Sequence, residues 1–138
     1  MIVIDTNIVL DMFVFNDPAS RLLKQALQAG QLRWLATQAM RDELERVLDY
    51  PQIVPRLALQ QRKAVDVLKQ FDELVQLVPQ ARKAPLNCSD ADDQKFLDLA
   101  LAHQAVLLSK DRALLRLKKR LTALGVCVQS QFTPTIDA

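Results

Sequence analysis

Histidine, glycine and cysteine are scarce in this chain of 138 residues, and each scarcity excludes a class of site. A single histidine, His103, rules out a multi-histidine metal site. Two glycines, Gly30 and Gly125, cannot build a phosphate-binding loop of the P-loop or dinucleotide type. Cys88 and Cys127 lack zinc-binding spacing and fit a reducing compartment. Catalysis, if the chain has any, must therefore depend on carboxylates.

Long apolar runs and export signals are also missing from the sequence. No run approaches the roughly 20 apolar residues that a membrane helix needs, and no signal peptide is recognisable. We therefore expect a cytoplasmic protein with no membrane contact. Hydrophobic residues make up 50% of the chain, which is enough for one core in a chain of single-domain size. The sequence thus predicts one domain over residues 1–138.

Strand and helix patterns alternate along the whole chain. Apolar runs predict strands at about 1–5, 32–36, 75–78, 105–109 and 126–128. Helical periodicity predicts helices at about 7–14, 18–29, 38–49, 60–74, 90–103 and 111–123, with a loop at 80–89. This alternation predicts an α/β fold, a three-layer α/β/α sandwich with a central parallel sheet.

Two predicted strands lead into acidic residues. Asp5 ends the run that begins at Met1, and Asp111 follows the strand at 105–109. Ligands of open α/β sheets bind at the carboxyl ends of the strands, so these carboxylates are expected to converge there. A hard divalent cation is the natural partner for such a cluster. The simpler interpretation is that Asp5, Thr6 or Asn7, and Asp111, cap the helices that follow them.

Helical phase separates two further acids from their neighbours. Glu43 falls on the flank of the apolar face of its helix, where it could lean toward a shared pocket or simply reach water. Asp93 falls inside an apolar arc, where an acid is costly unless it is paired, protonated or bound to a metal. Alternatively Asp90, Asp92 and Asp93 only complement the helix dipole. His103 shares the face of Asp93 about 15 Å further along, which indicates a core or boundary position.

Basic residues gather late in a chain whose net charge is +2. Arg112, Arg116 and the run from Lys118 to Arg120 share the last predicted helix. A basic rim beside an acidic pocket suits a phosphate-backbone substrate. The alternative is an ordinary solvated helix face.

The order of these motifs resembles the PIN domain family of metal-dependent ribonucleases, which includes the toxins of VapC-type toxin–antitoxin pairs. The resemblance covers essentially the whole chain and rests on Val3-Ile4-Asp5-Thr6-Asn7, Glu43, Asp93 and Ser109-Lys110-Asp111. The stretches 88–100 and 106–115 are similar to the bacterial branch grouped as toxin components. Ser109 departs from the more usual threonine or glycine but keeps a hydroxyl, and His103-Gln104 replaces a turn that commonly contains glycine.

What the resemblance implies is a Mg²⁺- or Mn²⁺-dependent endoribonuclease. Its acidic metal cluster would comprise Asp5, Glu43, Asp93 and Asp111. Thr6, Asn7 and Ser109 match supporting polar positions, and Asp92 competes with Asp93 as the ligand, although helical phase favours Asp93. Arg112 and Arg116 are candidates for binding the RNA backbone. The family also implies a homodimer and an antitoxin protein that covers the acidic site.

Two other functions compete with this interpretation. One is a catalytically silent PIN-like domain that binds RNA or protein, against which the presence of all four acids argues. The other is a receiver-like phosphoacceptor domain, which needs a lysine after its last strand. The segment 126–131 contains no lysine, which disfavours the second alternative.

Overall fold

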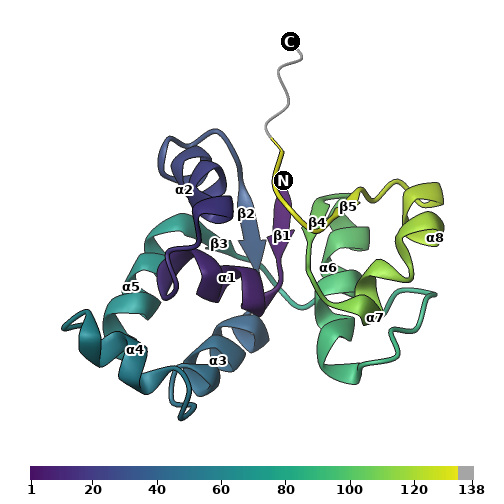
Figure 1. The fold of residues 1–138 in the computed structure, drawn as a ribbon. Helices are drawn as coiled ribbons and strands as arrows, with labels where there is room; N and C mark the ends of the chain where they lie inside the picture. Colours follow the sequence, from purple (N-terminus) through teal and green to yellow (C-terminus); the bar gives the residue numbers. More distant parts are fainter. Residues whose placement is uncertain (134–138) are drawn as a thin grey trace.

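Five short strands form one parallel sheet in the computed structural model, which describes residues 1–133 (Figure 1). In sheet order the strands are β3 (Val75–Leu77), β2 (Trp34–Ala36), β1 (Ile2–Ile4), β4 (Val106–Leu108) and β5 (Val128–Gln129). All four pairings are parallel. Because Ile4 lies opposite Leu108, the two central strands β1 and β4 end side by side.

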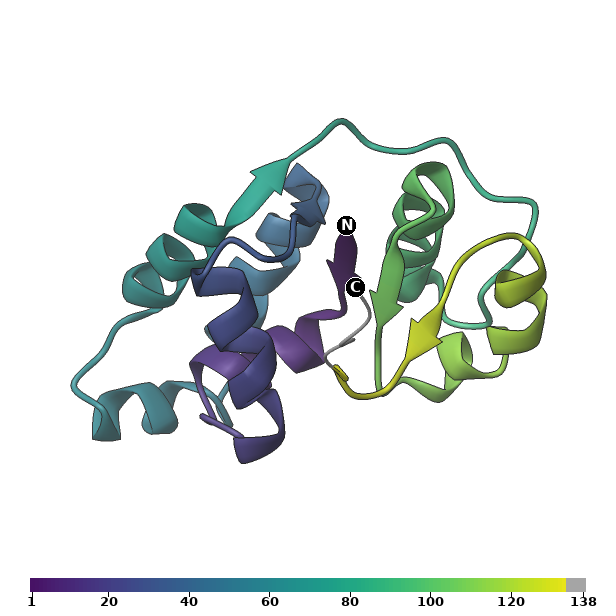
Figure 2. The ribbon, with the colours of Figure 1, turned by 90° about the horizontal axis from the view of Figure 1, so that it is seen from above.

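Helices cover both faces of this sheet. They are α1 (Thr6–Phe13), α2 (Arg21–Gln28), α3 (Gln38–Val47), α4 (Val54–Leu59), α5 (Ala64–Leu74), α6 (Gln94–His103), α7 (Arg112–Leu115) and α8 (Lys118–Ala123), with 3-10 turns at η1 (Pro18–Ser20) and η2 (Ala91–Asp93). Viewed from above, α1 to α5 lie on one side of the strands and α6 to α8 on the other (Figure 2). Right-handed crossovers explain the division, because the chain adds β2 and β3 on one side of β1, and β4 and β5 on the other. The predicted three-layer α/β/α fold is confirmed.

The core fixes the central strands from both faces. Every residue of β1 and β2 is buried, as expected for strands of a parallel sheet covered on both sides. On one face Trp34 packs against Phe13 and Phe71, with ring centroids 6.1 and 5.0 Å apart. On the other, Phe96 and Leu97 of α6 are buried. The carboxyl ends of β1 and β4 thereby lie at the edge of a core that is packed on both faces.

Several predicted boundaries were wrong. The predicted helix at 60–74 begins only at Ala64, because Gln61 adopts a positive φ of 55° that ends the preceding turn. Helical periodicity did not predict α4, whose start is favoured by a proline in its first turn. The predicted helix at 111–123 is divided into α7 and α8 near Leu117, where ψ is 5°. The last strand covers 128–129 instead of 126–128. Within the described residues, every helix is too short or too polar to cross a membrane.

Candidate metal centre

Three carboxylates meet at the carboxyl edge of the sheet. Asp5, Asp93 and Asp111 each offer one oxygen, and these oxygens all lie within 4.8 Å of one another. Asp5 directly follows β1, and Asp111 comes three residues after the end of β4. Asp93 is the last residue of η2, directly before α6, and its side chain joins the other two acids from the face of the sheet that α6 covers. The pairing of Ile4 with Leu108 explains why the first two acids are neighbours.

Asp5 begins α1 with its backbone, which leaves its side chain for the cluster. The Asp5 carbonyl accepts hydrogen bonds from the N–H groups of Ile8 (3.0 Å) and Val9 (3.1 Å). Within residues 1–133 its carboxylate makes no capping bond to the helix. That carboxylate is only 3% exposed and accepts a hydrogen bond at Oδ2 from the Ser109 hydroxyl (2.7 Å). The hydrogen bond from Ser109 is thus the main contact of the Asp5 carboxylate, although the backbone N–H of Asn7 also acts to lower the pKa of this group.

Ser109 joins the two strand-end acids. Its fully buried hydroxyl donates to Asp5 and accepts a hydrogen bond from the backbone N–H of Asp111 (3.0 Å). Asp111 in turn caps α7, because its Oδ1 accepts from the N–H of Ala113 (2.8 Å). The capping interpretation is thus correct for Asp111, yet the same residue belongs to the cluster. One hydroxyl and one cap fix the positions of both carboxylates.

Asp93 is the acid of the cluster whose charged form is disfavoured most strongly by its surroundings. It is 7% exposed, and its Oδ2 has no hydrogen-bond partner among the described residues. Burial, the hydrogen bond with Asp111 and the charges of Asp5 and Asp111 raise the pKa of Asp93 to about 8. Burial also raises the pKa of Asp5, against the lowering effect of its bond from Ser109. Buried, mutually repelling oxygens with a free acceptor fit a hard divalent cation, which prefers carboxylate ligands.

Glu43 lies beside the cluster and has partners of its own. It is not one of the three acids whose oxygens lie within 4.8 Å, although its charge contributes to the raised pKa of Asp5. Glu43 Oε2 accepts a hydrogen bond from the Thr6 hydroxyl (2.7 Å), and Oε1 lies 2.5 Å from Lys95 Nζ. The structure therefore places the fourth predicted acid next to the cluster and pairs it with a lysine.

Lys95 is a residue of the site that was not predicted from the sequence. It is the second residue of α6 and contacts both the Glu43 carboxylate and the backbone carbonyl of Asp92. A lysine in the first turn of a helix is opposed by the helix dipole, which favours acids there. That unfavourable position, two residues after Asp93, was the available signal for a specific partner.

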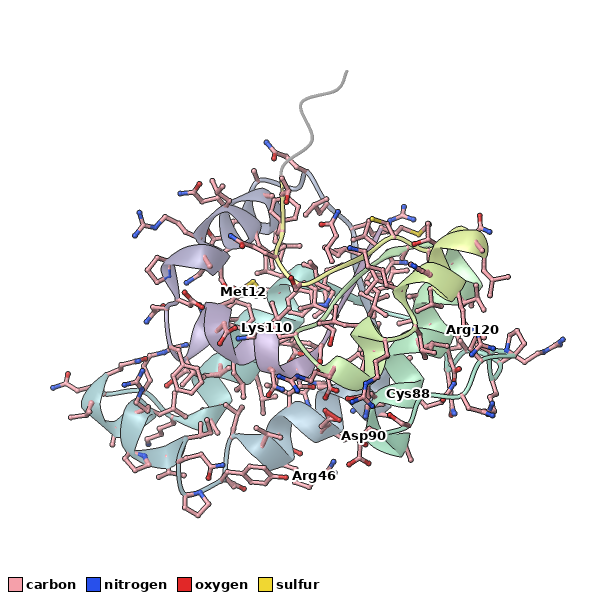
Figure 3. All side chains as sticks on the ribbon, turned by 45° about the vertical axis from the view of Figure 1, so that its right-hand side comes forward. Met12, Arg46, Cys88, Asp90, Lys110 and Arg120 are labelled. Carbon is pink, nitrogen blue, oxygen red and sulfur yellow. The ribbon has the colours of Figure 1, made fainter. Side chains whose placement is uncertain are left out.

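The other predicted residues lie around the cluster. Asn7 and Asp92 have exposed side chains, so the structure places Asp93, and not Asp92, among the clustered acids. Arg112 and Arg116 are also exposed, at the two ends of α7. Figure 3 labels Lys110, which lies between Ser109 and Asp111 in the chain and whose ammonium forms an ion pair with Asp11 of α1.

Replacing Ser109 by alanine tests the hydroxyl that joins Asp5 to Asp111. We expect Mn²⁺ affinity to fall about 10- to 100-fold, because hydrogen-bonded partners of ligands orient them at a cost of this size when lost. The free energy of unfolding should fall by about 1–3 kcal/mol, since Asp5 loses a buried partner. Titration calorimetry and denaturant unfolding measure the two quantities. Ser130→Ala, at an exposed serine, should change neither quantity, and unchanged Mn²⁺ affinity in Ser109→Ala would contradict the role of this hydroxyl.

Metal affinity should depend on pH through Asp93. At pH values below its pKa of about 8 the Asp93 carboxyl holds a proton, and a cation must displace that proton to bind. We expect the affinity for Mn²⁺ to rise up to about tenfold per pH unit from pH 6 to 8 and to level off above. Calorimetry in buffers of different ionisation enthalpy should detect proton release at pH 7. Equal affinity at pH 6 and pH 8 would argue against a protonated Asp93.

Comparison with known protein families gives one match. A family model described as the PIN domain matches residues 1–113. The matched range includes Asp5, Glu43, Asp93 and Asp111, and runs from β1 into α7. A comparison with curated proteins finds no match.

Proposed function

Because the chain belongs to the PIN domain family and carries a buried acidic cluster, we propose that it is a Mg²⁺- or Mn²⁺-dependent endoribonuclease. PIN domains are generally nucleases that use divalent metals, and the cluster is compatible with that chemistry. The observation that supports the proposal most is the buried, unpartnered Oδ2 of Asp93 beside two other carboxylates. In this proposal Asp5, Asp93 and Asp111 hold the ion.

The protein groups around the proposed ion have separate tasks. When bound, the ion supplies the positive charge that activates water and stabilises the developing charge on a phosphodiester. Ser109 keeps the Asp5 carboxylate in place, and the cap on α7 does the same for Asp111. In this proposal Glu43, held by the Thr6 hydroxyl, would act through a water molecule beside Asp5.

The proposed substrate contact uses the arginines next to the cluster. Arg112 directly follows Asp111, and Arg116 lies one turn further along. Both are exposed, which suits binding of RNA phosphates by charge. Because the proposed substrate is cellular RNA, we still expect the protein to be cytoplasmic.

Incubation of purified protein with a mixed RNA pool tests the proposal. Cutting is expected with Mg²⁺ or Mn²⁺ and none with EDTA, and single-stranded DNA of the same sequences serves as the substrate control. Absence of both cutting and Mn²⁺ binding would overturn the nuclease proposal. Mn²⁺ binding without cutting would favour the alternative of a silent PIN-like domain that binds RNA or protein.

We also propose that the chain is the toxin of a type II toxin–antitoxin pair. The support is the similarity of stretches 88–100 and 106–115 to the bacterial toxin branch of the family. An antitoxin would then cover the acidic edge of the sheet, and the single domain over residues 1–138 would form a homodimer. Induced expression in a bacterial host should arrest growth, and Asp5→Asn should abolish the arrest. Growth unaffected by active nuclease would contradict the toxin role.

A further inference from the structure

The contacts of Lys95 bear on the number of ions that the metal centre binds, given the proposed function. We propose that the Lys95 ammonium takes the place of a second cation, so that the centre binds one divalent ion. In this proposal Asp5, Asp93 and Asp111 bind the ion, and the Lys95 ammonium neutralises the Glu43 carboxylate.

The four acids divide into two groups by their contacts. Asp5, Asp93 and Asp111 place their oxygens within 4.8 Å of one another, an arrangement in which one divalent ion can be held by all three. Glu43 lies outside that set and has a positive charge 2.5 Å from its Oε1. The negative charge of Glu43 still acts on Asp5, so Glu43 belongs to the same electrostatic centre. Each group thus has its own counter-charge, a divalent ion for one and an ammonium for the other.

Lys95 is held firmly in this position. Its Nζ contacts Glu43 and the backbone carbonyl of Asp92, and lies 5.0 Å from the centre of the Phe96 ring. The side chains of Lys95 and Glu43 are 23% and 13% exposed, so solvent screens the pair less than an ordinary surface ion pair. These contacts offset the unfavourable position of a lysine in the first turn of α6.

The contacts of Glu43 leave little opportunity for a second ion. Thr6 binds Oε2, and Lys95 binds Oε1. A cation that used Glu43 as a direct ligand would have to displace the Lys95 ammonium or lie beside a like charge. Removing the lysine charge should therefore open a second site at Glu43.

Mn²⁺ stoichiometry, measured by titration calorimetry and electron paramagnetic resonance on the full chain, tests the proposal without RNA. Wild type and Lys95→Arg, which keeps the charge, should bind one ion. Lys95→Gln should bind two, with affinity for the second at least about tenfold above any secondary binding to wild type. The double variant Lys95→Gln/Glu43→Gln should return to one ion. Lys69→Gln, at an exposed lysine on α5, is the matched control and should bind one.

The possible outcomes separate this proposal from the nuclease proposal. Two ions on wild type, or one ion on a folded Lys95→Gln, overturns the role of Lys95 while leaving the metal-dependent nuclease intact. A second ion that persists in the double variant also overturns it, because Glu43 is then not the ligand. No Mn²⁺ binding by wild type overturns both proposals. Thermal unfolding without metal establishes that each variant is folded, and if Lys95→Gln does not fold, two ions on wild type still overturn the proposal.

Discussion

Replacing Asp5 by asparagine is expected to reduce metal-dependent RNA cleavage at least about a thousandfold, with the fold retained. Asparagine has nearly the same shape, and its amide oxygen can still accept the hydrogen bond from Ser109. The variant lacks the negative charge that the proposed ion requires, and loss of several kcal/mol of charge stabilisation has an effect of this size. The cleavage rate at saturating Mn²⁺ under single-turnover conditions measures it.

The control for Asp5→Asn is an acid outside the cluster. Asp49 is exposed just after α3, and Asp49→Asn should cleave RNA at the wild-type rate. Thermal unfolding in EDTA should show that both variants are folded. A cleavage rate for Asp5→Asn within tenfold of wild type would contradict the role proposed for Asp5.

Replacing Asp93 by asparagine is expected to change stability in opposite directions with and without metal. The pKa of Asp93 is about 8 in the folded protein and about 4 when unfolded, so the folded state binds the proton more tightly. Its contribution to stability is complete below pH 4 and is lost as pH rises toward 8, by up to about 1.4 kcal/mol per pH unit. Asparagine needs no proton. In EDTA at pH 9 the variant should therefore be more stable than wild type, and at pH 5 the advantage should shrink.

Saturating Mn²⁺ should reverse that order. Wild type gains stability by binding the ion, whereas Asp93→Asn lacks one of the three clustered carboxylates and should gain little. Denaturant unfolding at pH 5 and pH 9, with EDTA or Mn²⁺, measures all four conditions. The neighbouring Asp92→Asn, at an exposed acid, is the matched control and should behave as wild type. An Asp93→Asn variant that is less stable than wild type in EDTA at pH 9 would contradict the claim that the charged Asp93 carboxylate destabilises the folded protein.

The residues that the sequence could locate are those whose positions follow from local pattern and sheet topology. Asp5 and Asp111 follow apolar strands, and parallel strands end at the same edge, so their proximity was predictable. Asp93 was distinguished from Asp92 by helical phase alone, and the structure places Asp93 in the cluster. These predictions needed only the period of each element and the order of strands and helices.

Contacts between distant segments could not be predicted in the same way. The pair of Lys95 with Glu43 joins residues 52 positions apart, and it depends on how α3 and α6 approach the sheet edge from opposite faces. Helix breaks were missed for a different reason. Gln61 adopts a positive φ, and Leu117 interrupts the last helical stretch, although neither residue type signals a helix end. Local propensity therefore did not predict these boundaries.

The most direct test of the central claim is a crystal structure of the protein grown with Mn²⁺ above pH 8, with anomalous difference density used to locate the ion. A single peak about 2.0–2.4 Å from carboxylate oxygens of Asp5, Asp93 and Asp111 is the predicted result. Lys95 should remain paired with Glu43 in the same crystals. No anomalous peak at this edge of the sheet at saturating Mn²⁺, or a peak held by other residues, would contradict the acidic metal centre.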